Sequence, residues 1–437
     1  MSGRTAARTA PSAGLTYQPY FGVEIEIFVK LNKDQEDNIK DKQRRAPSTL
    51  PDHLRYWDFS LSNEANANVA DLKDMQRARV GMAVEKIIDL TLGPGHGWSC
   101  KADASLKEWT ICAEAPDRKK WWGIEIISPP TSVTTSWQRE IEDVFDAIGK
   151  KFDFWTNTCC ATHVHVSPGP NKNSKYKLDQ LVNRAKGAYF WEDALCEVLP
   201  PERRKNRYAL PNHQIYAGLE YLDVTIDAWR PLFERLENTA SGRDGKVKLL
   251  NALRRGPVGT DQCTRYVSTS FHPTDSLGTI ELRRQAGSAS AMTVIHRVLL
   301  AVTLHVSGLR YDYRKVHSRL SYPTVDELIA ELQECIKDLP GTCHGKRFVN
   351  WLRWCVATYA RNYQPSEFEI NKNERCLRWG GEYPTVRLPA RTRPNGPSLP
   401  RTPATQRQRA ASRAPARADI RDRAMVEAWE DTRRARR

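Results

Sequence analysis

The sequence predicts an α+β fold, with an antiparallel or mixed sheet covered by helices on one face. Short segments alternate polar and apolar residues, as half-buried strands do. These strand-like segments are residues 20–28, 122–129, 162–168 and 279–284. Longer segments between them repeat apolar residues at helical spacing. They are residues 68–90, 136–151, 178–199, 224–236 and 289–309. One polar and one apolar strand face favours a sheet with helices on a single side.

Composition divides the chain into four regions. We predict a disordered leader at 1–19, a catalytic domain at 20–310, a helical accessory region at 311–385 and a disordered basic tail at 386–437. The tail is rich in Pro, Ala and Arg, so it buries too little apolar surface to offset chain entropy. Residues 31–71 are polar and irregular, and we expect a long loop or insertion there.

Most of the positive charge lies at the ends of the chain. The 437 residues carry a net charge of +15, of which residues 386–437 supply +9 from 14 Arg and 5 acidic residues. Arg4 and Arg8 add +2, which leaves only +4 for the body. A nucleic-acid partner is therefore not expected for the main function, although a non-enzymatic polyanion-binding protein acting through its tail stays an alternative.

Cysteine usage favours a reduced, cytoplasmic location. The ten cysteines include no C-x-x-C pair, and residues 1–20 lack the apolar run of a secretory signal. A mitochondrial location is the weaker alternative, suggested by basic and hydroxyl residues near the N-terminus. The longest apolar stretch, Val298–Val306, is far shorter than the roughly 20 residues that span a bilayer, so no membrane association is expected.

Two predicted strands place pairs of chemically active side chains on one face. Residues two apart in a strand share a face, so Glu24 and Glu26 lie together, as do His163 and His165. Taken alone, a Glu pair is more typical of a solvated strand face. His-x-His occurs in metal sites, in zinc hydrolases and in ordinary cores.

Two further strands add charge in the same manner. Glu125 lies between two isoleucines in the segment that ends at Pro129, and alone it is typical of a surface residue. Glu281 and Arg283 share a face, either as a simple ion pair or as a metal carboxylate beside a phosphate-binding guanidinium.

Together, the charged side chains of these four strands predict a metal site more strongly than any one strand does alone. One sheet could bring these four strands together, and a face rich in carboxylates suits Mg²⁺ or Mn²⁺ better than Zn²⁺, because hard cations prefer oxygen ligands. Nucleotide phosphates are natural remaining ligands. A zinc metallohydrolase that uses His163 and His165 is the rival enzyme hypothesis.

The ordered series of motifs resembles the amidoligase family of carboxylate-amine ligases, related to glutamine synthetase and γ-glutamylcysteine ligase. The matching motifs are FGVEIEI (21–27), KADASL (101–106), GIEIISP (123–129), THVHVS (162–167), RRKNRY (203–208), RY (265–266) and TIELRR (279–284). The resemblance covers about Tyr20 to Leu309. It weakens after Tyr266, where VSTSF replaces an Asn-containing strand, and no motif matches beyond Tyr311.

The resemblance implies a glutamine synthetase-like fold and an ATP- and Mg²⁺-dependent ligase that joins amino acid or peptide substrates through an acyl phosphate. It assigns metal binding to Glu24, Glu26, Glu125 and Glu281, metal or nucleotide contact to His163 and His165, and the transferring phosphoryl group to Arg283. Asp103 and Ser105 would lie near the acceptor substrate. Arg203, Arg204 and Arg207 would contact a carboxylate or phosphate, or lie at a helix end. Neither the general base nor the oligomeric state is predicted.

Overall fold

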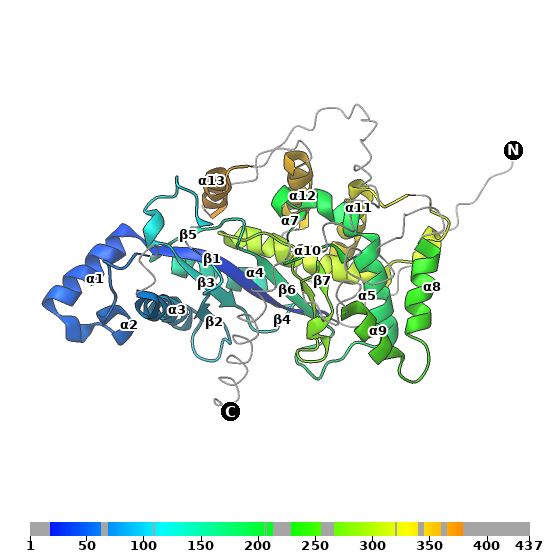
Figure 1. Cartoon of the computed structure of the whole chain (residues 1–437), viewed down its shortest axis with the longest axis horizontal. Helices are drawn as coiled ribbons and strands as arrows, with labels where there is room; N and C mark the ends of the chain where they lie inside the picture. The colour runs from blue at the N-terminus through cyan, green and yellow to red at the C-terminus, as the bar shows by residue number, and fades with distance from the viewer. Residues whose placement is uncertain are drawn as a thin grey trace, which may run out of the picture. The chain divides into compact units, whose positions relative to one another are not determined.

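One long strand, β1 (Tyr20–Leu31), organises the sheet of the computed structural model (Figure 1). On one edge it pairs with β4 (Thr131–Ser132) and β3 (Trp122–Ile127), and on the other with β6 (Thr162–Ser167) and β5 (Phe152–Trp155). The structure describes residues 18–62, 69–107, 110–204, 206, 208–212, 229–254, 266–319, 321–339, 345–359 and 365–378. They belong to a unit spanning Met1–Val386, whereas Arg387–Arg437 form a second unit outside them.

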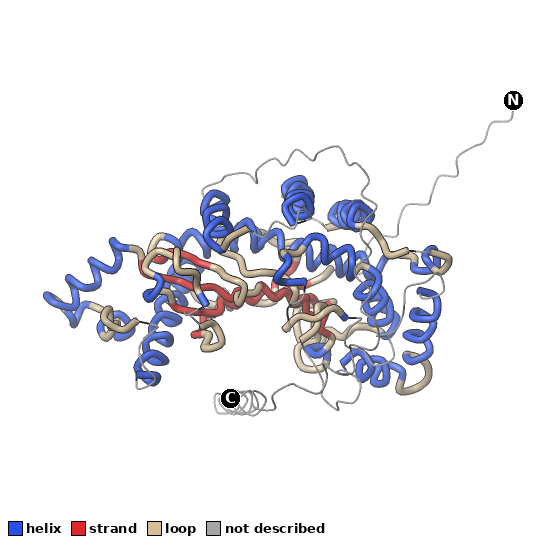
Figure 2. The backbone as a smooth tube through the Cα atoms, turned by 45° about the horizontal axis from the view of Figure 1, so that its top comes forward, coloured by secondary structure: helices blue, strands red, loops and turns tan. Residues whose placement is uncertain are grey.

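All strand pairs of this sheet are antiparallel, so the predicted α+β class with an antiparallel sheet is confirmed. The order is β2-β3-β1-β6-β8-β7, where β2 is Ser99–Ala102, β7 is Thr269–Ser270 and β8 is Ile280–Leu282. Figure 2 shows the strands as a central band with helices above it and at both ends. Strands that are distant in sequence, such as β1, β6 and β8, are therefore neighbours in the sheet.

The two faces of the sheet differ as the alternating sequence predicts. Val23, Ile25 and Ile27 of β1 are fully buried in the main hydrophobic core. Helices α3 (Ala70–Leu92), α4 (Trp137–Gly149) and α10 (Ala291–Arg310) supply the other side of this core. The opposite face carries the side chains of Glu24 and Glu26, which are only partly buried. We call it the polar face.

Helix α10 is the central helix of the apolar layer. It contacts β1, β6 and helices α4, α5 (Leu178–Phe190) and α11 (Val325–Lys337). Within the described residues it is the one helix long and apolar enough to cross a membrane by length and composition, and 89% of its most apolar 18-residue window is buried in this structure. Its apolar composition is explained by packing on all sides.

Six further helices surround this core. They are α6 (Glu192–Val198), α7 (Pro201–Arg204), α8 (Trp229–Thr239), α9 (Gly245–Arg254), α12 (Gly345–Tyr359) and α13 (Glu367–Arg378). The predicted helix 178–199 is two helices, α5 and α6, that meet at Trp191. The start of the predicted helix 224–236 lies outside the described residues, and α8 begins at Trp229.

Helices α11 to α13 pack onto the body rather than standing apart. Helix α11 begins with a capping box in which Thr324 and Glu327 satisfy each other's backbone N–H groups. Buried Asn371 of α13 accepts a hydrogen bond from Thr156 N (2.9 Å) and donates one to Thr156 O (2.9 Å). Glu374 accepts from Ala289 N at 3.1 Å. Side-chain hydrogen bonds therefore fix α13 against the end of the sheet.

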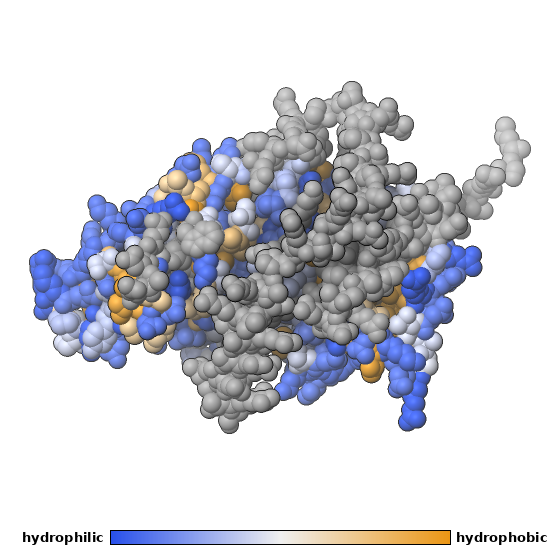
Figure 3. Space-filling view, viewed as in Figure 1, coloured by the Kyte–Doolittle hydropathy of each residue, from blue (hydrophilic) through white to orange (hydrophobic). Residues whose placement is uncertain are grey.

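The expectation of a loop at 31–71 is wrong for two parts of that segment, and residues 63–68 lie outside the described residues. Residues Lys33–Arg45 form α1 and Asp52–Arg55 form α2. Helix α1 buries only Ile39, so it carries no apolar stripe from which a helix could be predicted. Its support is polar: the Asn32 cap and ion pairs such as Lys40–Glu36, spaced i to i+4. Figure 3 shows this end of the molecule, at the left, as hydrophilic.

The eight cysteines among the described residues are all free thiols. Four of them are buried, and burial raises the pKa of Cys100, Cys160 and Cys355. Cys263 and Cys343 lie outside the described residues. These buried thiols are packing residues of low reactivity.

Candidate metal and phosphate site

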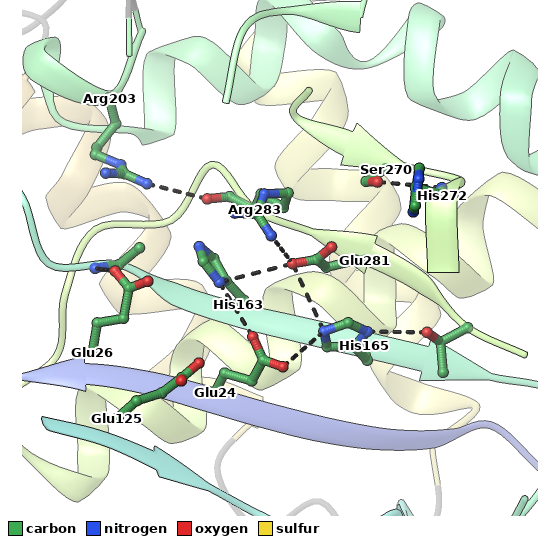
Figure 4. A network of polar contacts seen from close by, with 12 residues as sticks. Glu24, Glu26, Glu125, His163, His165, Arg203, Ser270, His272, Glu281 and Arg283 are labelled. Atoms are coloured by element: carbon green, nitrogen blue, oxygen red, sulfur yellow. Dashed lines mark hydrogen bonds and ion pairs between the residues drawn. The ribbon is translucent and has the colours of Figure 1, made fainter. Parts of the chain in front are cut away.

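Strand register brings most of the sequence-predicted site residues onto the polar face (Figure 4). Glu24 of β1 lies opposite His163 of β6, and His165 lies opposite Glu281 of β8. On the other edge of β1, Glu26 lies opposite Glu125 of β3. Opposed residues in an antiparallel pair share a face, so four strands contribute to one cluster.

The centre of the cluster is a triad of potential metal ligands: Glu24, His165 and Glu281. One ligand atom from each lies within 4.8 Å of the other two. Two oxygens on opposite sides of a Mg²⁺ ion are separated by about 4.2 Å, because Mg–O distances are about 2.1 Å. Movements of a few tenths of an ångström would therefore close these ligands around an ion.

His165 is oriented as metal-binding histidines usually are. Its Nδ1 is hydrogen bonded to Thr279 Oγ1 at 3.0 Å, while Nε2 faces Glu24 Oε1 at 3.4 Å and Glu281 Oε1 at 3.7 Å. Nε2 is buried and has no hydrogen-bond partner within the described part of the chain. A ring fixed through one nitrogen, with the other aimed between two carboxylates, fits a metal ligand.

His163 lies beside the triad and contacts the same two carboxylates. Its Nδ1 is 3.4 Å from Glu24 Oε2 and 3.8 Å from Glu281 Oε1. Burial and the Arg283 charge lower the pKa of His163. For His165, burial is outweighed by Glu281 and Glu24, which raise its pKa. Burial opposes ionisation of Glu24, but its contacts with both imidazoles prevail and hold the pKa of Glu24 below its usual range.

Glu26 and Glu125 occupy the same face but are held by other partners. Glu26 accepts a hydrogen bond from Ala161 N at 2.9 Å, and Glu125 forms an ion pair with Lys101. Burial, together with the Asp103 and Glu125 charges, raises the pKa of Glu26 to about 8. Burial and the Glu24 charge raise the pKa of Glu125 to about 7. Both carboxyls therefore border the triad, and their role as metal ligands stays a prediction.

Two arginines bring positive charge to the β8 side. Arg283 donates from Nη1 to Glu281, and its Nε is buried without a hydrogen-bond partner among the described residues. Arg203, in α7, is buried and donates to the carbonyls of Arg283 (3.1 Å) and Arg284 (3.3 Å). Arg204 instead bonds the carbonyl of Leu199 near its own helix, and Arg207 lies outside the described residues.

Asp103 and Ser105 form a local turn rather than two separate ligands. Asp103 Oδ1 accepts from Ser105 N at 2.8 Å and from Ser105 Oγ at 2.6 Å. The turn passes close over Gly123 of β3, where an added Cβ would lie 2.5 Å from Leu106 Cβ. Glycine at 123 thus lets the turn approach the sheet, and Asp103 comes near enough to Glu26 to influence its pKa.

Comparison with known families identifies this arrangement. The model of the family described as "putative amidoligase enzyme" matches residues 18–304, about two thirds of the chain. The chain belongs to the amidoligase family. A search of curated proteins finds no match. Membership indicates a ligase, and the matched region contains every residue of the cluster described above.

Sequence reasoning missed two supporting residues of this amidoligase. Thr279 fixes the His165 ring, and Lys101 neutralises Glu125. Both positions belong to the quoted motifs KADASL and TIELRR, but only the register shows that Lys101 lies directly opposite Glu125. Thr279 precedes β8, and nothing in its local sequence indicates its contact across the sheet with β6.

Proposed function

We propose that this amidoligase is an ATP- and Mg²⁺-dependent (or Mn²⁺-dependent) ligase that joins the carboxylate and amine of amino acid or peptide substrates through an acyl phosphate. The observation that carries the proposal is the triad of Glu24, His165 and Glu281 with the Arg283 guanidinium beside it. Carboxylate oxygens suit a hard divalent cation, and a guanidinium suits a phosphoryl oxygen.

Charge on the polar face supports the same conclusion. When all are ionised, five carboxylates meet three cationic side chains, which leaves an excess of two negative charges. They are Glu24, Glu26, Asp103, Glu125 and Glu281 against Lys101, Arg203 and Arg283. Like charges this close oppose ionisation unless a cation lies among them. A bound Mg²⁺ would supply this positive charge and would neutralise phosphate oxygens there.

The chain's own groups can position both reaction steps. In the first step a substrate carboxylate oxygen bonds to the γ-phosphorus of ATP as the bond to ADP breaks, and Arg283 is placed to donate hydrogen bonds to the transferring phosphoryl oxygens. In the second step the amine attacks the acyl carbon, phosphate leaves, and the nitrogen loses a proton. Glu281 itself is only 3% exposed, so bulk water has little access to that carboxylate.

The test is substrate-dependent ADP formation by the full-length protein. Purified protein is incubated with Mg²⁺ and ATP against pools of amino acids and short peptides, with hydroxylamine added in parallel to trap an acyl phosphate as its hydroxamate. Glu281→Gln should lose turnover. Glu334→Gln is a matched control, because it makes the same change in an exposed acid of α11.

Full activity in Glu281→Gln would refute the assignment of the site. If no pool produces ADP and the purified protein instead contains tightly bound Zn²⁺, the ligase proposal fails in favour of a hydrolase.

A further inference from the structure

A second cavity, apart from the triad, lies where the C-terminal helices meet the end of the sheet. Its volume is about 330 Å³, within the range of small-molecule sites. It is bounded by the turn after β5, the start of α10, α7, α12 and α13. The parts from α12 and α13 lie beyond residues 18–304, the region matched by the family.

The polar feature of this cavity is Arg297 of α10. Its side chain is buried, with 7% of the residue exposed. Nε donates to Ser288 Oγ at 2.8 Å and Nη2 donates to the Gly287 carbonyl at 3.2 Å. Within the described ranges no carboxylate lies at ion-pair distance from it, and its Nη1 makes no hydrogen bond. Glu202 and Glu374 line the same cavity and act on this guanidinium from beyond ion-pair distance, which leaves Nη1 for an anionic ligand group.

Part of the remaining lining is apolar and aromatic, beside the acids Glu202, Glu367 and Glu374. Trp351, Trp354 and Tyr359 project from α12, and Leu199 and Ile370 complete the surface. Aromatic walls with a few fixed polar groups are typical of sites for small amphipathic molecules. The ligand should therefore join an apolar group to a carboxylate.

The cavity also borders the polar face. Ala286, in its lining, pairs with Ala161, whose N–H is bonded to Glu26. Glu202 lines the cavity, while the next residue, Arg203, contacts the carbonyl of Arg283. The cavity is thus linked to the edge of the polar face through Ala161 and Arg203.

We infer that this cavity binds the amine-donating substrate, and that this substrate is an α-amino acid with an apolar or aromatic side chain. Its carboxylate binds Arg297 and is thereby kept from phosphorylation, its side chain packs on the α12 aromatics, and its amino group is left to react. Glu202 supplies an acid in the same cavity for the ammonium form. The role of this amino acid as a substrate rests on the proposed ligase function, whereas its binding in the cavity does not.

The experiment is calorimetric titration of full-length protein without ATP or Mg²⁺. The ligands are L-leucine, L-phenylalanine, L-phenylalaninamide, which lacks the carboxylate, and 3-phenylpropionate, which lacks the amine. We expect at least one of the two amino acids to bind, and the amide to bind at least about tenfold more weakly than phenylalanine, since a buried charged hydrogen bond is lost. Arg297→Gln should weaken phenylalanine and phenylpropionate similarly and leave the amide unchanged.

That selective loss separates a lost ligand contact from a damaged fold, and Arg297→Lys should recover part of the affinity. The matched control Glu334→Gln should bind phenylalanine as the wild type does. Binding in this pattern without Mg²⁺-ATP turnover would uphold the cavity as an amino acid site while the ligase proposal fails. Equal affinity for phenylalanine and its amide, or no binding of either amino acid, would overturn the inference.

Discussion

The triad predicts that divalent cations stabilise the folded protein. A cation that binds the native state and not the unfolded chain raises the free energy of unfolding by an amount set by its concentration and dissociation constant. The perturbations are titration with Mg²⁺ or Mn²⁺ and the substitution Glu24→Gln. Glu24 is suitable because it faces both imidazoles from the centre of β1 and is not part of the apolar core.

The expected size follows from the linkage relation and the size of the folded body. At a free ion concentration of 100 times Kd the stabilisation is about 2.7 kcal/mol. For the roughly 360 residues from Tyr20 to Arg378, an unfolding entropy of about 2.1 cal/mol/K per residue converts this to a rise in Tm of about 4 °C.

Losing a carboxylate ligand should almost abolish the effect. Losing even an indirect ligand partner weakens metal binding about 10- to 100-fold, so we take about 100-fold for Glu24→Gln. The same ion concentration then equals Kd, and the stabilisation falls to about 0.4 kcal/mol, below about 1 °C in Tm.

The assay is differential scanning calorimetry of each protein with and without the ion, because the difference between the two scans cancels any effect of the substitution on the metal-free fold. The Tm shift of Glu334→Gln should agree with the shift of about 4 °C expected for the wild type to within about 1 °C. A Glu24→Gln protein that keeps the wild-type shift would refute the triad as the binding site. A wild type with no shift for either ion would refute the presence of a divalent-cation site.

Three further predictions concern the framework around the site. Glu192 and Arg284 form a fully buried ion pair, so Glu192→Ala should lower the free energy of unfolding, measured with denaturant, by about 3–5 kcal/mol. The double variant Glu192→Leu/Arg284→Met should recover most of that loss. A double variant as unstable as the single one would contradict this. Asn371→Ala leaves the N–H and carbonyl of Thr156 unpaired and should lower the free energy of unfolding by about 2–4 kcal/mol, whereas a loss below about 0.5 kcal/mol would show that α13 is held elsewhere. Contacts that outweigh burial lower the pKa of Glu327 to about 2, so its carboxylate stabilises the fold above about pH 4.5 and loses that effect as the pH falls toward 2. Because Glu327 is partly exposed, Glu327→Gln should lower the free energy of unfolding by at most about 1 kcal/mol at pH 7 and by less at pH 3. A difference that does not depend on pH would contradict this.

The fold class could be predicted from the sequence because polar and apolar residues alternate along the strands, and this alternation separates the polar face from the core. Glu24 and Glu26 alternate with Val23, Ile25 and Ile27, so the strand and its two environments follow from one short segment. The α1 helix shows the limit of this reasoning. It is stabilised by local charge pairs and a cap, and these leave no apolar period to detect.

The membership of the triad could not be predicted in the same way. From the sequence alone, the four carboxylates on strand faces cannot be distinguished: Glu24, Glu26, Glu125 and Glu281. The register between the strands determines which side chain each of them meets. Glu125 meets Lys101 across β2 and β3, whereas Glu24 meets two imidazoles across β1 and β6. Register depends on loop lengths and on packing far from the motif, so it cannot be inferred from the motif alone.

The polar face is costly to fold without a ligand, and this cost is itself evidence for function. Burial and like charges raise the pKa of Glu26 to about 8 and of Glu125 to about 7, so ionising these carboxyls near neutral pH opposes folding. Apolar or amide side chains at these positions would remove the repulsion and keep the strands paired. A fold that needed only stability would not gather five acids beside one another, since like charges at short distance oppose one another's ionisation. The arrangement is explained if a cation and its phosphate ligands complete it, which is the condition that the ion-titration experiment measures.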